Sequence, residues 1–146
     1  MAKKNGVDFE FELESFVDDV KKDAWKKGET ALTQVGIDAQ RNVVALVPVE
    51  TGLLKNSITY AIAGKSPAKK SYKADKGGAT GTYEGTIGDP NELAVYIGSN
   101  VEYAAAVEFR EAKHPDGGQA HFLRDGISNH LGEYEQAIKN ILNEPT

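Results

Sequence analysis

A proline followed closely by a Thr-Gly pair divides the chain near the end of its first third. Pro48 lacks a backbone N–H and its ring clashes with the carbonyl four residues back, so a helix must end before it. Thr51 and Gly52 then predict a turn, because glycine adopts positive φ without a steric penalty. From there, side chains alternate in polarity over residues 57–63. The sequence therefore predicts a helix before the proline and a half-buried strand after it.

Apolar residues upstream of the proline recur mostly at helical spacing. Residues 9–13 alternate between apolar and acidic side chains and predict a short strand, after which Ser15 is positioned to cap a helix of about three turns. Thr30 is positioned to cap a second segment, in which apolar residues recur three or four apart. Gly28 and Gly36 interrupt this pattern, and a glycine inside a helix costs about 1 kcal/mol against alanine. One bent helix and two separate helices both fit it.

The part of the chain after residue 63 combines loops with short regular segments. Residues 64–82 carry five lysines among Gly, Ser, Pro and Ala without apolar periodicity, which predicts an exposed, flexible loop. Residues 83–88 and 93–98 predict two antiparallel strands around a Gly-Asp-Pro-Asn turn, and residues 101–109 predict a short helix. From about residue 120, an amphipathic pattern predicts a helix of five to six turns lying across the sheet.

These elements predict an α+β fold. An antiparallel sheet of three to four strands is flanked by a long N-terminal helical segment and a C-terminal amphipathic helix. The 146 residues fit a single domain spanning residues 1–146, since a chain of this size buries roughly 68–70 % of its unfolded surface. The chain has no cysteine, which excludes disulfides, thiolate zinc sites and thiol nucleophiles. No apolar run approaches the roughly 20 residues that span a bilayer, so we expect neither secretion nor a membrane location.

Charge is distributed unevenly along the chain. Residues 1–76 hold 13 Lys and Arg against 11 Asp and Glu, whereas residues 77–146 hold 4 against 11. An acidic half argues against a protein that grips nucleic acid by its phosphates, but not against a surface that DNA merely passes. The alternative hypothesis is a small nucleic-acid-binding module that uses the lysines from Lys65 to Lys76, with Tyr72 as a stacking residue.

The residues that could carry catalysis or bind a metal do not form a recognisable site. His114, His121 and His130 lack the i, i+4 spacing with which a helix presents two imidazoles to one metal. The glycine-rich run before Tyr83 lacks the lysine of a phosphate-binding loop. Glu108 is expected to be held in an ion pair by an arginine, Arg110 or Arg124, or across a subunit contact. We therefore predict no catalytic residue, no metal, no cofactor and no enzymatic activity.

Three blocks of the sequence resemble one known family. Pro48, Thr51-Gly52, Leu54 and Ser57-Ile58 match a Pro-x-x-Thr-Gly-x-Leu-x-x-Ser-Ile signature. The second block is a strand ending in glycine, Val95 to Gly98, followed by Tyr-Ala-x-x-Val-Glu-Phe from Tyr103 to Phe109, and the third is Phe122-Leu123-Arg124. Together they cover roughly residues 30–142 and resemble the head-tail joining proteins of tailed bacteriophages, also called neck or tail-completion proteins. The chain departs from this pattern at Arg110-Glu111, where the family often has Gly-Thr, and at His121 and Asp125, where it often has proline.

The resemblance implies a minor tail component of the virion neck, assembled in the host cytoplasm. It implies a homo-oligomeric ring of six copies, or twelve, between the head-closure or portal-side protein and the tail terminator or tail tube proteins. DNA would pass through the lumen without specific binding. The candidate contact residues lie mostly in the predicted loops, which carry recognition more often than the core does. They are Glu50, Thr51, Gly52, Leu53, Lys65, Lys69, Lys70, Tyr72, Lys73, Glu108, Phe109, Arg110, Glu111, Lys113 and Arg124.

Overall fold

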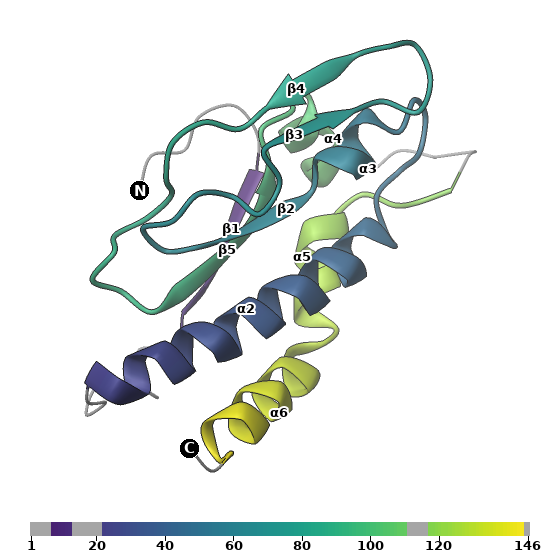
Figure 1. Cartoon of the computed structure of the whole chain (residues 1–146). Helices are drawn as coiled ribbons and strands as arrows, with labels where there is room; N and C mark the ends of the chain where they lie inside the picture. The colour runs from purple at the N-terminus through teal and green to yellow at the C-terminus, as the bar shows by residue number, and fades with distance from the viewer. Residues whose placement is uncertain (1–6, 13–21, 111–116, 145–146) are drawn as a thin grey trace.

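The computed structural model describes residues 7–12, 22–110 and 117–144 of the chain. A three-stranded antiparallel sheet has the order β1 (Val7–Glu12), β5 (Ala94–Ser99) and β2 (Thr59–Ile62). Figure 1 shows the long helix α2 (Lys22–Val44) running between this sheet and the C-terminal helices. The mixed helix-and-sheet class, the long N-terminal helix and the strand near residue 9 are confirmed. The helix predicted after Ser15 begins outside the described residues.

Helix α2 is continuous through both of its glycines. Thr30 does not cap a second helix, since it lies inside α2 and its hydroxyl donates to the carbonyl of Lys26 at 3.0 Å. At Gly36 a Cβ atom would lie 2.5 Å from the ring of Tyr60 on β2. The glycine that weakens the helical pattern therefore leaves room for the Tyr60 ring against the helix, and it does not divide the segment into two helices.

The hydrophobic core fills the space between α2, the inner face of the sheet and the C-terminal helices. Alternate residues of β5, Val95 and Ile97, belong to this core, and β2 contributes Ile62. Helix α2 contributes apolar residues that recur three or four positions apart, which is the pattern predicted from the sequence. These are Leu32, Val35, Ala39 and Val43, each at most 1 % exposed.

The C-terminal segment forms two helices, so the prediction of one long helix across the sheet is wrong. Helix α5 (Phe122–Ser128) and helix α6 (Leu131–Leu142) are separated at Asn129 and His130, where the amide of His130 donates to the carbonyl of Ile127 at 3.1 Å. Both helices pack on α2, which itself covers the sheet (Figure 1).

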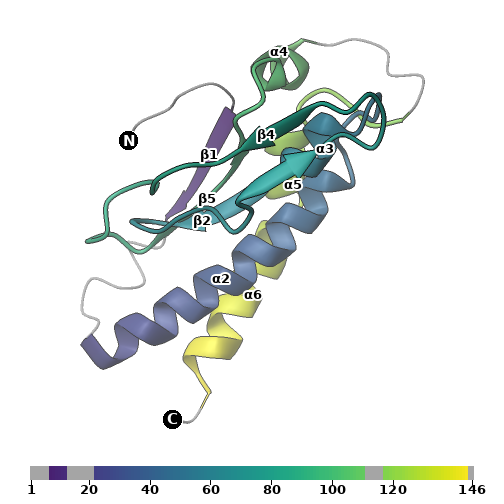
Figure 2. The same ribbon diagram turned by 45° about the horizontal axis from the view of Figure 1, so that its top comes forward.

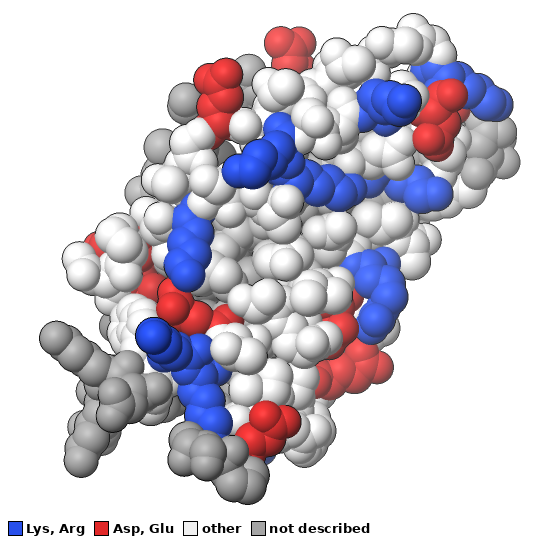
Figure 3. Space-filling view, viewed as in Figure 1, with Lys and Arg blue, Asp and Glu red and all other residues white. Residues whose placement is uncertain are grey.

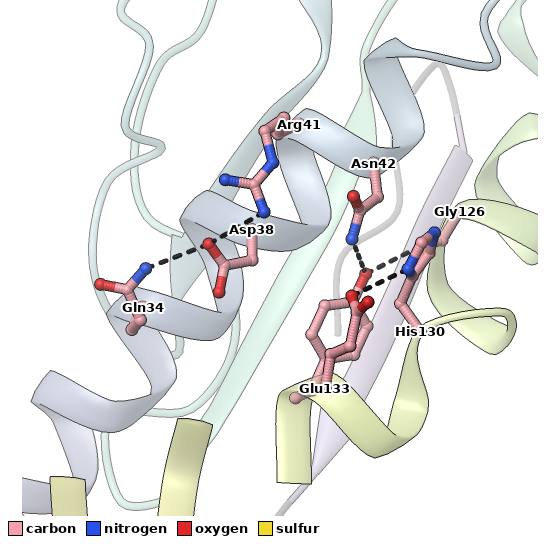
Figure 4. Close-up of polar contacts among 8 residues, drawn as sticks. Gln34, Asp38, Arg41, Asn42, Gly126, His130 and Glu133 are labelled. Carbon is pink, nitrogen blue, oxygen red and sulfur yellow. Dashed lines mark hydrogen bonds and ion pairs between the residues drawn. The ribbon is translucent and has the colours of Figure 1, made fainter. Parts of the chain in front are cut away.

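A buried tyrosine joins the two C-terminal helices to α2. The Tyr134 hydroxyl donates to the carbonyl of Gly126 on α5 at 2.8 Å and accepts from Nδ2 of Asn42 on α2 at 3.0 Å (Figure 4). Burial raises the pKa of Tyr134, while the hydrogen bond with Asn42 opposes this rise. At the start of α6, His130 Nδ1 and Glu133 Oε2 lie 2.9 Å apart, again as drawn in Figure 4. Through its two hydrogen bonds, the Tyr134 side chain of α6 thus connects α2 and α5 to its own helix.

The segment after Pro48 contains the predicted turn and strand, together with a short helix that the sequence did not predict. The predicted turn is confirmed at Gly52, whose φ is 86°. A short helix α3 (Leu53–Ser57) then precedes β2, which begins at Thr59 rather than residue 57. The amide of Asn56 donates to the carbonyl of Gly52 at 2.9 Å, which closes the helical turn. The two buried residues of α3, Leu54 and Ser57, are three positions apart, which is helical spacing and not strand spacing.

The lysine-rich segment contains a β-hairpin where the sequence predicts loop throughout. Strands β3 (Ser71–Lys73) and β4 (Thr80–Thr82) pair antiparallel and form a second, separate sheet. The predicted pairing of residues 83–88 with 93–98 is wrong, because β5 pairs with β1 and β2. Gly85 and Gly88 have φ of 76° and 79°, which a regular strand does not accommodate.

The short helix predicted over residues 101–109 is present as α4 (Ala104–Phe109). It starts after a turn in which the amide of Val101 donates to Ser99 Oγ at 3.0 Å and the amide of Ala104 donates to the carbonyl of Val101. Figure 2 shows α4 projecting at the margin of the molecule, beside β1.

Candidate functional site

The Thr-Gly turn fastens the tip of the β3–β4 hairpin. The carbonyl of Thr51 accepts hydrogen bonds from the amides of Asp75 and Lys76 at 2.8 and 3.0 Å. At Gly52 a side chain would collide with the carboxylate of Asp75, and the positive φ is strained for any other residue. Asn56 Nδ2 also donates to the carbonyl of Lys73 at 2.8 Å and to Asp75 Oδ1 at 3.0 Å. The first signature block therefore positions the lysine-rich hairpin.

The same turn meets the start of α4 across a small hollow. The hollow has a volume of about 80 Å³, and Glu50 and Leu53 lie on one side with Tyr103 and Val107 on the other. Burial raises the pKa of the Tyr103 hydroxyl, while its hydrogen bond with Thr51 acts in the opposite direction. Two sequence blocks that are about 50 positions apart thus form one surface. Tyr103, which the residue-based prediction of contacts missed, is the link between them.

Glu108 is buried and caps helix α5. Its carboxylate accepts hydrogen bonds from the backbone amides of Leu123 at 2.8 Å and Arg124 at 3.2 Å, and its carbonyl accepts from the amide of His121 at 2.8 Å. His121 adopts a left-handed conformation with φ of 56°, which turns the chain into α5. A carboxylate at a helix N-terminus satisfies amides that have no partner within the helix. Glu108, only 3 % exposed, is therefore engaged by the backbone of its own chain.

Helix α4 presents apolar side chains to solvent. Phe109 is 69 % exposed and Tyr103 is 45 % exposed, with the small Ala106 exposed between them. Arg110, just after the helix, is also exposed, and the candidates Glu111 and Lys113 lie outside the described residues. Tyr103, Ala106 and Phe109 are called here the α4 stripe. Because the buried Glu108 attaches α4 to the start of α5, the stripe is held in a defined orientation.

The lysines of the hairpin region fall into two groups. Lys65 forms an ion pair with Glu29 of α2 at 3.3 Å, and Lys69 Nζ donates to the carbonyl of Asn56 at 2.7 Å. Burial lowers the pKa of Lys69. Lys70 and Lys73 are exposed and form no ion pair with any described residue. Figure 3 shows lysine side chains gathered over this part of the surface.

Tyr72 is an internal part of the hairpin. Its ring lies 5.5 Å from that of Tyr83, and it covers Gly81, where a Cβ atom would overlap the Tyr72 ring. Its hydroxyl donates to Asn100 Oδ1, and burial raises its pKa. These contacts occupy the ring and the hydroxyl, so Tyr72 is not presented as a stacking platform for a base.

A hydrogen-bond network joins the base of the hairpin to the sheet. The Tyr83 hydroxyl donates to the carbonyl of Ser57 at 2.6 Å and accepts from the amide of Asn100 at 3.2 Å. The buried hydroxyls of Ser57 and Ser99 lie 2.6 Å apart. The serine of the first block therefore packs against the end of β5, which belongs to the second block.

A larger groove of about 560 Å³ lies on the outer face of the sheet, opposite α2. Its floor includes Thr59 and Ala61 of β2 and Tyr96 of β5, and the segment from Tyr83 to Ile87 forms a wall. Among the described residues that line the groove, Glu84 is the one charged side chain, so these residues include no cluster of charged groups.

Arg124 lies at the first turn of α5. Arg124 Nε is 2.9 Å from Asp125 Oδ1, and this arginine side chain is 57 % exposed. The hydrogen bond from Arg124, joined by one from Gln119 at 2.6 Å, lowers the pKa of Asp125. Over residues 7–12, 22–110 and 117–144, no three His, Cys, Asp or Glu side chains are grouped so as to hold a metal ion. No described helix is both long enough and apolar enough to cross a membrane.

Comparison with known proteins places these features in a family. The model described as "Bacteriophage HK97-gp10, putative tail-component" matches residues 11–109, which include the Thr-Gly turn, the hairpin, the central strand and α4. No curated protein and no solved structure matches the chain. The matched span covers more than half of the sequence. It includes both the Thr-Gly turn and α4, which together line the small hollow. The chain therefore belongs to the HK97-gp10-like family of bacteriophage tail components.

Proposed function

We propose that this protein is a structural subunit of the virion neck that completes the tail and joins it to the portal side of the capsid. Copies of the chain form a ring of six, or of twelve, which contacts the head-closure or portal-side protein on one side and the tail terminator or tail tube on the other. Assembly takes place in the host cytoplasm. The role is mechanical, and it requires neither a catalytic residue nor a cofactor.

The α4 stripe is the observation that carries this proposal. An aromatic ring as exposed as that of Phe109 is costly to leave in water, and aromatic residues are enriched at protein interfaces. The stripe is supported by a buried carboxylate and adjoins the hollow beside the Thr-Gly turn. A rigid, exposed aromatic in a family of tail components suits a contact with another virion subunit.

The charge balance suits a ring through which DNA passes. Residues 77–146 carry 11 acidic side chains against 4 basic ones. Carboxylates that line a lumen repel the phosphate backbone, so the genome moves through without adhering. This part of the proposal predicts no specific DNA binding by the assembled ring.

The oligomeric state tests the proposal directly. We would measure the mass of the purified chain by light scattering after size exclusion, with and without its tail partner. The expected result is a ring-sized species, alone or with the partner, which Phe109→Ser abolishes without changing the unfolding midpoint. Leu131→Ser is the matched control, because Leu131 is 43 % exposed on α6, away from the α4 stripe. A strict monomer that ignores the tail partner would overturn the proposal.

A nucleic-acid-binding module is the second candidate, and the exposed lysines are the observation that favours it. Lys70, Lys73 and Lys76 have no carboxylate partner among the described residues. The Tyr72 ring and hydroxyl are engaged within the hairpin, which counts against base stacking and leaves only contacts with the nucleic-acid backbone. This function predicts DNA binding that weakens steeply with salt and is lost when the three lysines are changed to glutamine. Binding that survives those changes would exclude it.

A further inference from the structure

The groove on the outer face of the sheet is a surface that the chain's own side chains do not fill. Two positions of its lining, Gly98 of β5 and Ala61 of β2, carry little or no side chain and lie on adjacent, paired strands. Small residues leave depth above the strands, and the groove of about 560 Å³ occupies this space. Its volume lies within the range of about 300–1,000 Å³ that is usual for binding pockets.

The wall of the groove is anchored at both ends. At one end the amide of Tyr83 donates to the carbonyl of Lys70 at 2.9 Å. At the other end the amide of Ile87 donates to the carbonyl of Lys65 at 3.1 Å. The residues between these anchors are exposed and contribute to the lining. The single chain therefore forms the groove without help from a partner.

The lining of the groove combines apolar surface with a single anion. Ala61 and Pro67 are buried, Ile87 is half-buried, and threonine and tyrosine side chains contribute to the rest. Glu84 is the one charged side chain among the described lining residues, and it is exposed. It forms no ion pair with another described residue, although its neighbour Tyr83 pairs with the backbone of Lys70. An aromatic side chain accompanied by a cation would match this lining.

The α4 stripe ends in this combination. Phe109 is 69 % exposed and is followed directly by Arg110, which is exposed and has no ion-pair partner among the described residues. Phe109 is not among the described residues that line the groove, so the stripe does not fill the groove of its own chain. Figure 2 shows α4 at the top of the molecule and the segment between β4 and β5, which includes the groove wall, at the left. Each chain therefore carries two different surfaces of matching chemistry.

We propose that Phe109 of one copy inserts into the groove of the next copy, where Arg110 pairs with the carboxylate of Glu84. This inference rests on the proposed ring and names the surface that receives the α4 stripe. A ring with one kind of contact requires two different, complementary surfaces on each subunit. Aromatic side chains bury about 150–250 Å² each, which supplies affinity, whereas the charge pair fixes the register of the contact.

Blocking each surface separately tests this contact, with the whole chain used throughout. Phe109→Ser removes the aromatic ring, and Thr86→Trp fills the groove from an exposed position of its wall. Each variant alone should be monomeric under the conditions in which the unchanged chain assembles, as measured by light scattering after size exclusion. An equimolar mixture should form a 1:1 dimer and no ring. Only the Thr86→Trp chain then has an aromatic ring to insert, and only the Phe109→Ser chain has an open groove.

The control for added bulk is Thr30→Trp, at an exposed position of α2. It should assemble like the unchanged chain. Exchanging the two charges gives a second test that adds no bulk to the groove wall, so it remains decisive if Thr86→Trp lowers the unfolding midpoint. Arg110→Glu and Glu84→Arg should each weaken self-association by about tenfold, because either change places like charges at the contact. A chain with both changes should regain assembly, since opposite charges meet again.

The outcomes separate this contact from the proposed ring. Rings that persist in Thr86→Trp and in both single charge variants would overturn this inference and leave the proposed ring intact. Loss of binding to the tail partner in Thr86→Trp, with self-assembly unchanged, would also overturn it and assign the groove to that partner. A monomeric unchanged chain, even with its tail partner, would overturn both the ring and this contact.

Discussion

The helical layer and the β3–β4 hairpin are held in place by different kinds of interaction. Helices α2, α5 and α6 meet through fully buried apolar side chains, with Tyr134 as a polar clamp at their centre. The hairpin has short strands with largely exposed side chains, and it is attached through hydrogen bonds to Thr51, Asn56 and the Tyr83 network. Stability should therefore reside in the helical layer, whereas the hairpin and α4 should carry recognition at little cost to the fold.

Replacing the tyrosine clamp should produce the largest effect. Tyr134→Ala leaves a cavity at a position that is 0 % exposed and removes two hydrogen bonds, so we expect a loss of about 3–5 kcal/mol in the free energy of unfolding. Tyr134→Phe keeps the ring and should cost about 1 kcal/mol. Chemical denaturation measures both changes. A Tyr134→Ala variant as stable as the exposed-site variant Leu131→Ala would refute the assignment of stability to this layer.

Removing the carboxylate beneath α4 should have an intermediate effect and affect both regions. Glu108→Ala leaves the amides of Leu123 and Arg124 without their acceptor, which should cost about 1–2 kcal/mol. It should also release α4, so assembly should fall by more than the loss of stability alone explains. Glu102→Ala, an exposed change just before α4, is the control for both denaturation and light scattering. Equal effects of the two variants would show that the cap does not position the helix.

The same contrast explains which parts of the structure could be predicted. Local chemistry identified the end of the long helix before Pro48 and the turn at Gly52, because proline and glycine restrict the backbone wherever they occur. The strands that pair with β5 are distant in sequence, and no local pattern specifies them. The break at Asn129 contains no proline, so the helical periodicity continues across it. Glu108 was recognised as unusual, but its partners are backbone amides, which have no signature in the sequence.

Loosening the hairpin should change local opening more than global stability. Asn56→Ala removes the hydrogen bonds to the carbonyl of Lys73 and to Asp75, so amide exchange over residues 70–83 should accelerate by an amount equivalent to about 1 kcal/mol. The global unfolding midpoint should remain nearly unchanged. Asn140→Ala removes a side-chain hydrogen bond on exposed α6 and should leave exchange in the hairpin as it is. An equal change in both variants, or a large loss of global stability in Asn56→Ala, would contradict the division between the two regions.

The smallest effect should come from the Arg124–Asp125 contact in the first turn of α5, beside the Glu108 cap. Hydrogen bonding to Arg124 holds the pKa of Asp125 below its ordinary value of 3.8, so the carboxylate stabilises the fold above that value. This contribution is lost as the pH falls through the lower pKa of the folded state. Asp125→Asn should therefore flatten the decline of stability below about pH 4, measured as urea midpoints at a series of pH values. Because Arg124 is 57 % exposed, solvent screens the contact, and the change should be smaller than that of Glu108→Ala. If the urea midpoints of Asp125→Asn and of the unchanged chain fell identically below pH 4, the contact would contribute nothing to the stability of the fold.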